Sequence, residues 1–513
     1  MQYDFDTILD RRGRDALALD MIPYDGVEPK EGFSRIPMWV ADMSFPTAPP
    51  VLEAIRARLD HPNFGYFQLS GAYFDSIIRW QQARHGVSGL ERRHIGYENG
   101  ILGGVSSVVQ ALTCPGEPIL VHSPTYVGFT HTLERLGRPI IHTPLTQDAE
   151  GIWRMDYADM DRKLKESDIH VAILCSPHNP CGRVWERWEL EKAMEVYAAN
   201  DCTVISDEIW SDLIMPGYTH IPTQSVSRDA RERTVAFYAP TKTFSLAGLI
   251  GSYHIIYNDR LRCRVQRQGN LSGYNDCNVL SMHALTGAYS HAGMEWVDQL
   301  CAVLDKNLRY IRDFMESRFP GVTMMLPQGT YMLFVNCGAW CRSHGITPDD
   351  LRRRGVEHGV IWQSGAGFGD GDCIRINAAL PHALVREAML RNTYETGTTL
   401  SRIYAAEEAG DLTVYETLLT VATTSIDSRT AQGESAEDIA AWLAIYFQRL
   451  DSILGSGMVD PYAVLEGEIV AARSWEGSKG YPVEGTEWYQ KALEADGEAV
   501  FTDVYTDAAT GQP

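Results

Sequence analysis

Residues 234–251, TVAFYAPTKTFSLAGLIG, combine an apolar run with a lysine, Lys242, that has apolar residues on both sides. Three similar runs lie upstream: PILVHS (118–123), HVAILCSP (170–177) and CTVISDE (202–208). Short runs of nearly continuous apolar residues are typical of strands buried on both faces, and hence of a parallel sheet covered by helices. Residues 188–201, WELEKAMEVYAAND, predict a crossover helix between two of these strands. The stretch therefore predicts an α/β fold.

Polar side chains stand at the ends of these predicted strands. Tyr126 follows the first run, Asn179 follows the second, and Asp207 lies at the end of the third. Open α/β sheets bind ligands at the carboxyl ends of their strands, so we expect these side chains to meet Lys242 there. Taken singly, each has a plainer interpretation: core packing for Tyr126, a turn for Asn179, a helix cap or surface acid for Asp207.

Together, these side chains match the needs of pyridoxal phosphate (PLP). A lysine in an apolar setting is desolvated, which lowers its pKa and favours a Schiff base with an aldehyde. Asp207 would pair with the protonated ring nitrogen, Asn179 would donate to the ring oxygen, and Tyr126 would stack on the ring. The sequence therefore predicts PLP as cofactor and Lys242 as the catalytic residue.

A glycine-rich turn precedes a helical pattern in residues 98–112, ENGILGGVSSVVQAL. Backbone N–H groups at a helix start suit a phosphate, aided by the helix dipole. This pattern predicts cofactor contacts at Gly100, Ile101 and Leu102, and Thr241 would add a hydroxyl donor. A plain glycine turn is the alternative.

Arg375 lies in the middle of CIRIN (373–377), an apolar run that predicts a strand. A buried guanidinium needs a planar anion, and a substrate carboxylate would supply one. We therefore expect Arg375 to bind substrate. An internal salt bridge is the structural alternative.

The sequence pattern changes along the chain and predicts three regions. Residues 46–280 form the large α/β domain. Residues 281–395, with a long helical stretch followed by strands, the first of them over residues 322–337 (VTMMLPQGTYMLFVNC), form a small α+β domain together with residues 1–45. The composition shifts again near residue 396, where an acidic region begins: residues 401–513 hold 6 Lys and Arg against 20 Asp and Glu, which gives −14 of the net charge of −22.

Composition argues against several classes of protein. A net charge of −22 argues against nucleic acid as a partner, because phosphate backbones need basic surfaces. The ten cysteines show no metal-ligand spacing, so we expect no metal site and free thiols in a reducing cytoplasm. No apolar run approaches the roughly 20 residues that cross a bilayer, so no membrane segment is expected. The charged residues 1–15 are unlike a secretory signal.

Five motifs resemble fold-type I PLP enzymes, the aminotransferase class I/II superfamily, and within it the C–S β-lyase (cystathionine β-lyase) branch. They are MWVADMSFP (38–46), HPNFGYF (61–67), CSPHNPCGRVW (175–185), VISDEIWSDL (204–213) and TKTFSLAGL (241–249). The resemblance runs from about residue 3 to about residue 392. It implies a homodimer with active sites at the subunit interface, in which Tyr66 reaches the cofactor phosphate of the neighbouring subunit.

Two positions depart from the pattern of that family. Trp210 stands where relatives usually carry Tyr or His, and its indole donates a hydrogen bond but does not accept one. The resemblance still makes Trp210 a cofactor contact. Ala239 replaces a serine that commonly binds the phosphate, so one phosphate contact is expected to be absent.

The resemblance implies cleavage of cystathionine or a related cysteine S-conjugate into a thiol, pyruvate and ammonia. Lys242 would remove the α-proton, and the cofactor ring, paired with Asp207, would take up the electrons. Transamination shares the first steps and is the alternative activity. A PLP-binding regulatory or sensory protein is the alternative from a different class.

The last quarter of the chain falls outside that enzyme pattern. Residues 401–454 predict two acidic amphipathic helices joined by a polar turn. Further on, WYQKAL (488–493) and GEAVFTDVYTDAATGQ (497–512) resemble the first half of a bacterial Cache sensor domain. We expect either a partial Cache-like domain or an acidic appendage without a ligand.

Overall fold

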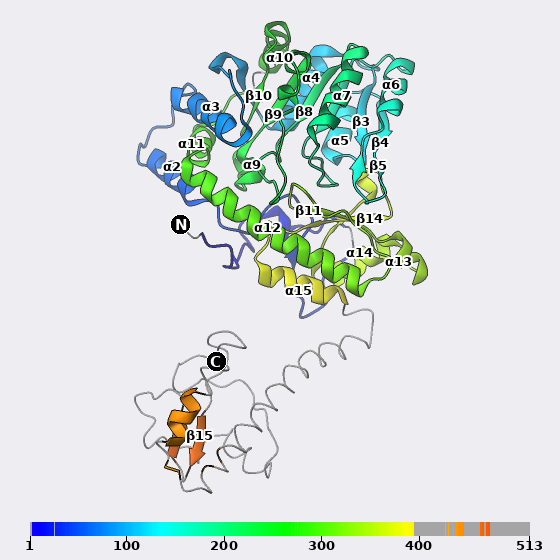
Figure 1. Cartoon of the computed structure of the whole chain (residues 1–513). Helices are drawn as coiled ribbons and strands as arrows, with labels where there is room; N and C mark the ends of the chain where they lie inside the picture. The colour runs from blue at the N-terminus through cyan, green and yellow to red at the C-terminus, as the bar shows by residue number, and fades with distance from the viewer. Residues whose placement is uncertain are drawn as a thin grey trace. The chain divides into compact units, whose positions relative to one another are not determined.

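The computed structural model describes residues 3–24, 26–271, 273 and 275–393, and then residues 426, 429, 434–435, 438–445, 462–465 and 468–471. The chain divides into two compact units, Met1–Glu395 and Thr396–Pro513. All of the predicted site residues lie in the first unit. Figure 1 labels the helices and strands of this unit.

A seven-stranded sheet forms the centre of the large domain, with the order β2-β10-β9-β8-β7-β3-β4. Every strand is parallel to the others except β10, which is antiparallel to both of its neighbours. The predicted mixed, mainly parallel sheet is therefore confirmed. The strands are β2 (Ile95–Glu98), β3 (Ile119–Ser123), β4 (Ile140–Pro144), β7 (Val171–Cys175), β8 (Thr203–Asp207), β9 (Thr234–Tyr238) and β10 (Ser252–Ile255).

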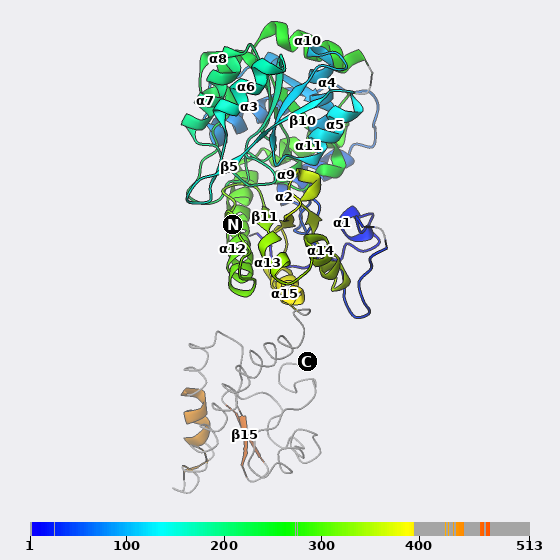
Figure 2. The same ribbon diagram turned by 90° about the vertical axis from the view of Figure 1, so that its right-hand side faces the viewer.

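Alternate residues of the central strands enter two different cores, one on each face of the sheet. In β7, Ala172 and Leu174 belong to one core, whereas Val171 and Ile173 belong to the other. This alternation explains why the strands are apolar throughout, because neither face meets water. Helices α6 (Tyr157–Glu166), α7 (Arg187–Ala199) and α8 (Arg228–Arg233) cover the first face; α4 (Ile101–Leu112), α5 (Val127–Arg135) and α10 (Asp259–Leu271) cover the second (Figure 2).

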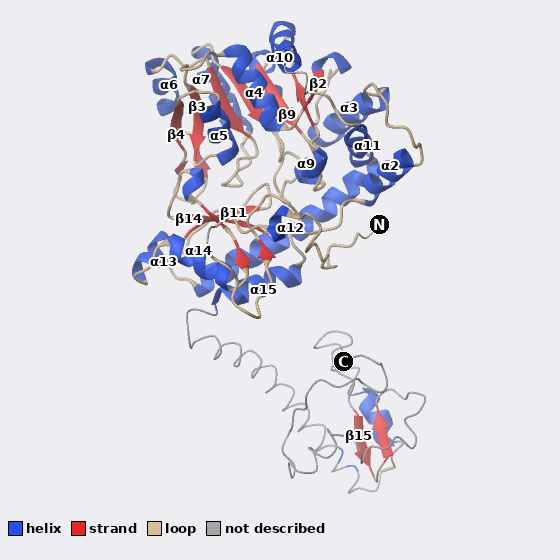
Figure 3. Cartoon of the chain, turned by 180° about the vertical axis from the view of Figure 1, so that it is seen from behind, coloured by secondary structure: helices blue, strands red, loops and turns tan. Residues whose placement is uncertain are grey.

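The small domain contains an antiparallel sheet with the order β11-β14-β13, which Figure 3 shows beneath the large domain. The N-terminal segment joins it, because β1 pairs in parallel with β12. Its strands are β1 (Ile36–Pro37), β11 (Met332–Asn336), β12 (Val360–Ile361), β13 (Gln363–Ser364) and β14 (Cys373–Asn377). Its helices are α12 (His291–Arg318), α13 (Gly338–Ser343), α14 (Pro348–Glu357) and α15 (His382–Thr393).

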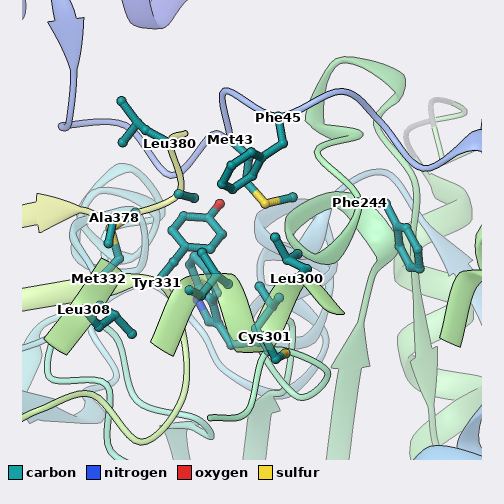
Figure 4. Close-up of a cluster of buried hydrophobic side chains, with 14 of the residues drawn as sticks. Met43, Phe45, Phe244, Leu300, Cys301, Leu308, Tyr331, Met332, Ala378 and Leu380 are labelled. Carbon is teal, nitrogen blue, oxygen red and sulfur yellow. The ribbon is translucent and has the colours of Figure 1, made fainter. Parts of the chain in front are cut away.

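One apolar core connects the two domains. It brings Met43 and Phe45 of the N-terminal segment together with Leu300 of α12 and Tyr331 next to β11 (Figure 4). The remaining elements of this unit are α1 (Leu17–Asp20), α2 (Pro49–Leu59), α3 (Gly71–His85), α9 (Pro240–Thr243), α11 (Val279–Ala288) and the hairpin β5 (Thr146–Gln147) and β6 (Trp153–Arg154).

One predicted strand is shorter than the sequence indicates. The run 322–337 predicts a strand, but only Met332–Asn336 forms β11. The backbone N–H groups of Gln328 and Thr330 donate instead to the carbonyls of Gly182 and Leu213, at 2.9 and 2.8 Å. These bonds draw residues 328–330 into a loop that packs against the large domain.

The second unit contains a short hairpin, β15 (Tyr462–Leu465) and β16 (Glu468–Ala471). Residues 438–445 are helical, and Ile439 and Leu443 pack with Ile426. The rest of the two predicted acidic helices and the Cache-like motifs lie outside the described residues. Among the helices that the structure describes, none combines the length and the apolar character that crossing a bilayer requires.

Candidate active site

Lys242 lies in the short helix α9, directly after β9. The Lys242 side chain is half-buried, and its Nζ donates a hydrogen bond to the carbonyl of Ala41 at 3.0 Å. It also lies 6.0 Å from the centre of the Trp210 ring. Burial, aided by the charge of Arg375, lowers the pKa of Lys242 to about 8, although Asp42 and Asp207 act in the opposite direction. Near pH 7 roughly a tenth of this amine is therefore neutral, far more than at the ordinary lysine pKa, and the neutral form is the one that a nucleophile requires.

A cavity of about 240 Å³ lies against Lys242 at the carboxyl ends of the strands. Nine predicted site residues line it: Gly100, Ile101, Leu102, Tyr126, Asn179, Asp207, Trp210, Thr241 and Lys242. They come from segments that lie far apart in sequence and converge where the strands end, as the topology predicts.

Asp207 is the last residue of β8 and is only 4% exposed. Its Oδ1 accepts the backbone N–H of Ile209 at 3.1 Å. Burial raises the pKa of Asp207 to about 7; the Ile209 bond and the charge of Lys242 lower it, and Glu208 raises it. Within the described residues no cation forms a salt bridge with Asp207. A positively charged N–H group at this point would stabilise the ionised carboxylate.

Arg375 lies in β14, buried beside the cavity and linked to it through Asn179. Its guanidinium donates to Asn179 Oδ1 at 3.0 Å, to Gln363 Oε1 at 2.6 Å and to the carbonyl of Trp39 at 3.1 Å. All three partners are neutral, and Nε has no hydrogen-bond partner. Burial lowers the pKa of Arg375 to about 10. Among the described residues no carboxylate pairs with Arg375, so the structure does not show the internal salt bridge considered as the alternative.

Helix α4 begins at the edge of the cavity. Its N-cap, Gly100, has φ 77° and ψ 155°, a conformation that is almost restricted to glycine, and no side chain caps the helix. The first backbone N–H groups of α4, at Ile101 and Leu102, therefore lie at the cavity wall with the positive end of the helix dipole.

Two aromatic residues of the site differ in their surroundings. Trp210 is buried and packs edge-on against Tyr331, with ring centres 4.8 Å apart. Tyr66 lies in the connection between α2 and α3, is fully exposed at 111%, and does not line the cavity. Within one chain the structure does not bring Tyr66 to the other site residues.

Sequence reasoning missed several residues at the cavity. Ala41 belongs to the motif MWVADMSFP (38–46), but its contribution is a backbone carbonyl, which side-chain chemistry does not reveal. Ile250, Gly251 and Ser252 line the cavity at the start of β10. Sequence reasoning could have found these three residues, because they follow Lys242 closely in the chain.

The residues present fit PLP. The buried Asp207 carboxyl has no cationic partner among the described residues, Arg375 has no anionic one there, and α4 presents uncapped N–H groups. These are the partners that a protonated ring nitrogen, a substrate carboxylate and a phosphate would use. No group of three or more His, Cys, Asp or Glu side chains within the described residues is arranged to hold a metal.

Comparison with known proteins gives consistent matches. The model of the family "Aminotransferase class I and II" matches residues 42–391. Cystathionine beta-lyase PatB of Bacillus subtilis is 35% identical over 359 residues, which cover 69% of this chain and 91% of that protein.

Two solved structures show the same likeness. Cystalysin from Treponema denticola, which contains PLP, gives a TM-score of 0.71 at 30% identity and covers 77% of this chain and 98% of its own. The PLP-bound C-S lyase from Staphylococcus hominis gives a TM-score of 0.69 at 29% identity. The match covers 77% of this chain and 100% of that one. With a family match over more than half of its length, this chain belongs to the aminotransferase class I and II family.

Proposed function

We propose that the chain is a PLP-dependent carbon–sulfur β-lyase that cleaves cystathionine or related L-cysteine S-conjugates to a thiol, pyruvate and ammonia. The observation that carries the proposal is the pairing, in one cavity, of a lysine with lowered pKa and a buried carboxyl with raised pKa. The similarity to cystathionine beta-lyase PatB and to two PLP-containing structures, cystalysin and a C-S lyase, supports it.

Eight of the residues that line the cavity hold the cofactor. The N-terminus of α4, at Gly100, Ile101 and Leu102, together with Thr241, holds the phosphate. Asp207 pairs with the ring nitrogen and Asn179 donates to the ring oxygen. Tyr126 and Trp210 contribute aromatic walls. When bound, PLP supplies an aldehyde that condenses with amines and a ring that accepts electrons from the substrate.

Lys242 performs the proton transfer. Its pKa of about 8 leaves a neutral amine available near neutral pH, and this amine takes the proton from Cα of the substrate. The carbonyl of Ala41, 3.0 Å away, fixes the position of Nζ. Loss of the Cα proton allows the Cβ–S bond to break, and the sulfur leaves as a thiolate.

Arg375 orients the substrate. Asn179, Gln363 and the carbonyl of Trp39 fix the guanidinium plane, which leaves Nε–H and the second N–H of Nη1 to bind the α-carboxylate. This placement sets which bond at Cα faces Lys242. Transamination uses the same groups and differs in where the proton is returned.

We further propose that the enzyme is a cytoplasmic homodimer. The fully exposed Tyr66 lies among other exposed aromatic residues, Phe64 and Phe67, and a second subunit would cover this segment. The ten free cysteines suit a reducing compartment.

A product assay on a panel of substrates tests the activity. Wild-type protein given cystathionine is expected to release pyruvate and homocysteine in equal amounts, without a matching keto acid of the substrate. Release of the keto acid that keeps the whole carbon skeleton of the substrate, instead of pyruvate, would assign the chain as an aminotransferase. No turnover on any substrate would favour a binding protein.

Lys242→Ala is expected to lose turnover by at least about 10³-fold, because one group serves as both attachment point and base. Borohydride treatment should attach the cofactor to Lys242 in the wild type and leave the variant unlabelled. Lys306→Ala, on the exposed side of α12, is the control and should keep wild-type activity. Turnover that persists in Lys242→Ala would exclude the proposed role.

A further inference from the structure

A second cavity, of about 430 Å³, lies in the large domain at the C-terminal end of α3. The loop 219–225, the N-terminus of α7, helix α8 and strands β9 and β10 complete its walls. It shares no lining residue with the cavity beside Lys242. The proposed catalytic steps do not use it.

The charge of this second cavity is opposite to that of the whole chain. Arg187 and Arg231 line it, and none of its lining residues is acidic. His85 and His220 line it as well, but each lies against a buried carboxylate behind the wall, Asp212 at 3.1 Å and Glu208 at 2.8 Å, so the two arginines carry its positive charge. The chain as a whole carries a net charge of −22, so a wall with only basic ionisable groups besides tyrosine is unexpected by composition. Such a wall attracts anions.

The arginines of the second cavity are available to a ligand. Arg231 lies over the ring of Tyr257, 5.0 Å from its centre, and within the described residues no carboxylate pairs with it. Arg187 approaches Glu191 only at 3.7 Å, and both side chains are about half exposed. Exposed pairs of this kind contribute little, so a ligand can displace this one.

A buried histidine adds an unsatisfied polar atom at the same place. The side chain of His220 is 2% exposed, and its Nε2 lies 2.8 Å from Glu208 Oε2. Its other ring nitrogen, Nδ1, is buried without a hydrogen-bond partner. The ring of His85 packs edge-on against the ring of His220, with ring centres 5.2 Å apart. In the neutral ring Nε2 donates to Glu208 and Nδ1 is an acceptor, so a hydrogen-bond donor on a bound molecule would satisfy it.

Apolar side chains form the remaining wall. Val87, Ile221 and Ile255 line the cavity together with the charged and hydroxyl groups. A cavity of this size is larger than an inorganic ion needs. Its surface therefore suits a molecule with one anionic group and an apolar body.

We propose that this second cavity binds a small organic anion, with Arg231 and Arg187 holding its charged group and the apolar wall holding its body. The proposal does not depend on the proposed lyase activity.

Binding of simple probes to the full-length protein tests the proposal. Benzoate and phenyl phosphate carry the two common anionic groups on the same ring, and benzyl alcohol is the neutral analogue. Calorimetry is expected to show saturable binding of at least one anion and at least tenfold weaker binding of benzyl alcohol. The preferred anion distinguishes a carboxylate from a phosphate ligand.

Variants locate the site. Arg231→Gln is expected to weaken anion binding by at least tenfold and to leave cystathionine cleavage unchanged. Arg187→Gln, a substitution at an exposed position, should weaken anion binding as well. Arg228→Gln, an exposed residue of the same helix α8 that does not line the cavity, is the matched control and should bind as the wild type does.

Lys242→Ala should also bind the anion normally, which separates this site from the active site. No saturable binding up to about 20 mM, or equal affinity in wild type, Arg231→Gln and Arg187→Gln, would overturn the proposal.

Discussion

The cavity changes the pKa values of two of its side chains, Asp207 and Lys242, in opposite directions. Burial makes each charged form less favourable, so the pKa of the acid rises and that of the amine falls. Opposite shifts of neighbouring groups are a mark of catalytic sites. The cavity thus keeps the amine reactive and leaves the acid in need of a cationic partner.

The raised pKa of Asp207 predicts a pH dependence of stability in the cofactor-free protein. The unfolded carboxyl loses its proton near pH 4, whereas the folded one keeps it until about pH 7. The folded state therefore binds more protons between these values, and stability falls as pH rises. The free energy of unfolding of the wild type, relative to that of Asp207→Asn, should fall by about 2–3 kcal/mol between pH 5 and pH 8. The estimate uses about 1.4 kcal/mol per pKa unit.

Urea unfolding of both cofactor-free proteins at the two pH values measures this difference. Parallel stability curves for the wild type and Asp207→Asn would show that Asp207 ionises normally in the folded protein.

Arg375 makes a second prediction at the residue scale. Its planar guanidinium is held by Gln363 and Asn179, and a lysine at this position could not keep both contacts and still present a fork to a carboxylate. Arg375→Lys is expected to lower kcat/KM for cystathionine by about 10- to 100-fold, the range for a lost charge-assisted pair. Steady-state kinetics measure it. Arg342→Lys, exposed on α13, is the control, and equal losses in both variants would contradict the assignment.

At the scale of the element, the N-terminus of α4 depends on the backbone of Gly100. An added Cβ there meets no protein atom within 4 Å, so in the cofactor-free protein a substitution acts only through its φ of 77°. Gly100→Ala should therefore strain or shift the first turn of α4 by about 1–3 kcal/mol and weaken PLP binding by about 10-fold or more.

Equilibrium titration of the cofactor-free protein with PLP measures that change. Gly116→Ala carries a similar strain, with φ 92° and open space, in a turn away from the cavity. It should lose stability without losing PLP affinity. If both variants bind PLP equally well, α4 does not hold the phosphate.

The strands show how far sequence reasoning reaches. The four apolar runs correspond to β3, β7, β8 and β9, because a strand buried on both faces leaves an unbroken apolar signal. The same reasoning fails for residues 322–331, where residues 328–330 bond to loops of the large domain. It also fails for Ala41, since a backbone carbonyl carries no side-chain signature. Contacts between segments far apart in sequence determine both the loop at residues 328–330 and the contact of Ala41 with Lys242.

The whole molecule consists of an enzyme unit and a further unit that begins near residue 396. The family match ends at residue 391, so the site and its chemistry belong to the first unit. One predicted site residue, Tyr66, is not brought to the cavity by the fold of a single chain. The proposed homodimer would bring Tyr66 to the active site of the neighbouring subunit.

Mixing two inactive variants tests whether Tyr66 serves the active site of a partner subunit. Lys242→Ala and Tyr66→Ala are each expected to be nearly inactive. In a mixed dimer, one site combines both substitutions, and the other has Lys242 from one subunit and Tyr66 from the other. Equal mixing with subunit exchange should therefore restore about a quarter of the wild-type activity, because half of the dimers carry one intact site of two. If each subunit used its own Tyr66, no intact site would form and the mixture would stay inactive.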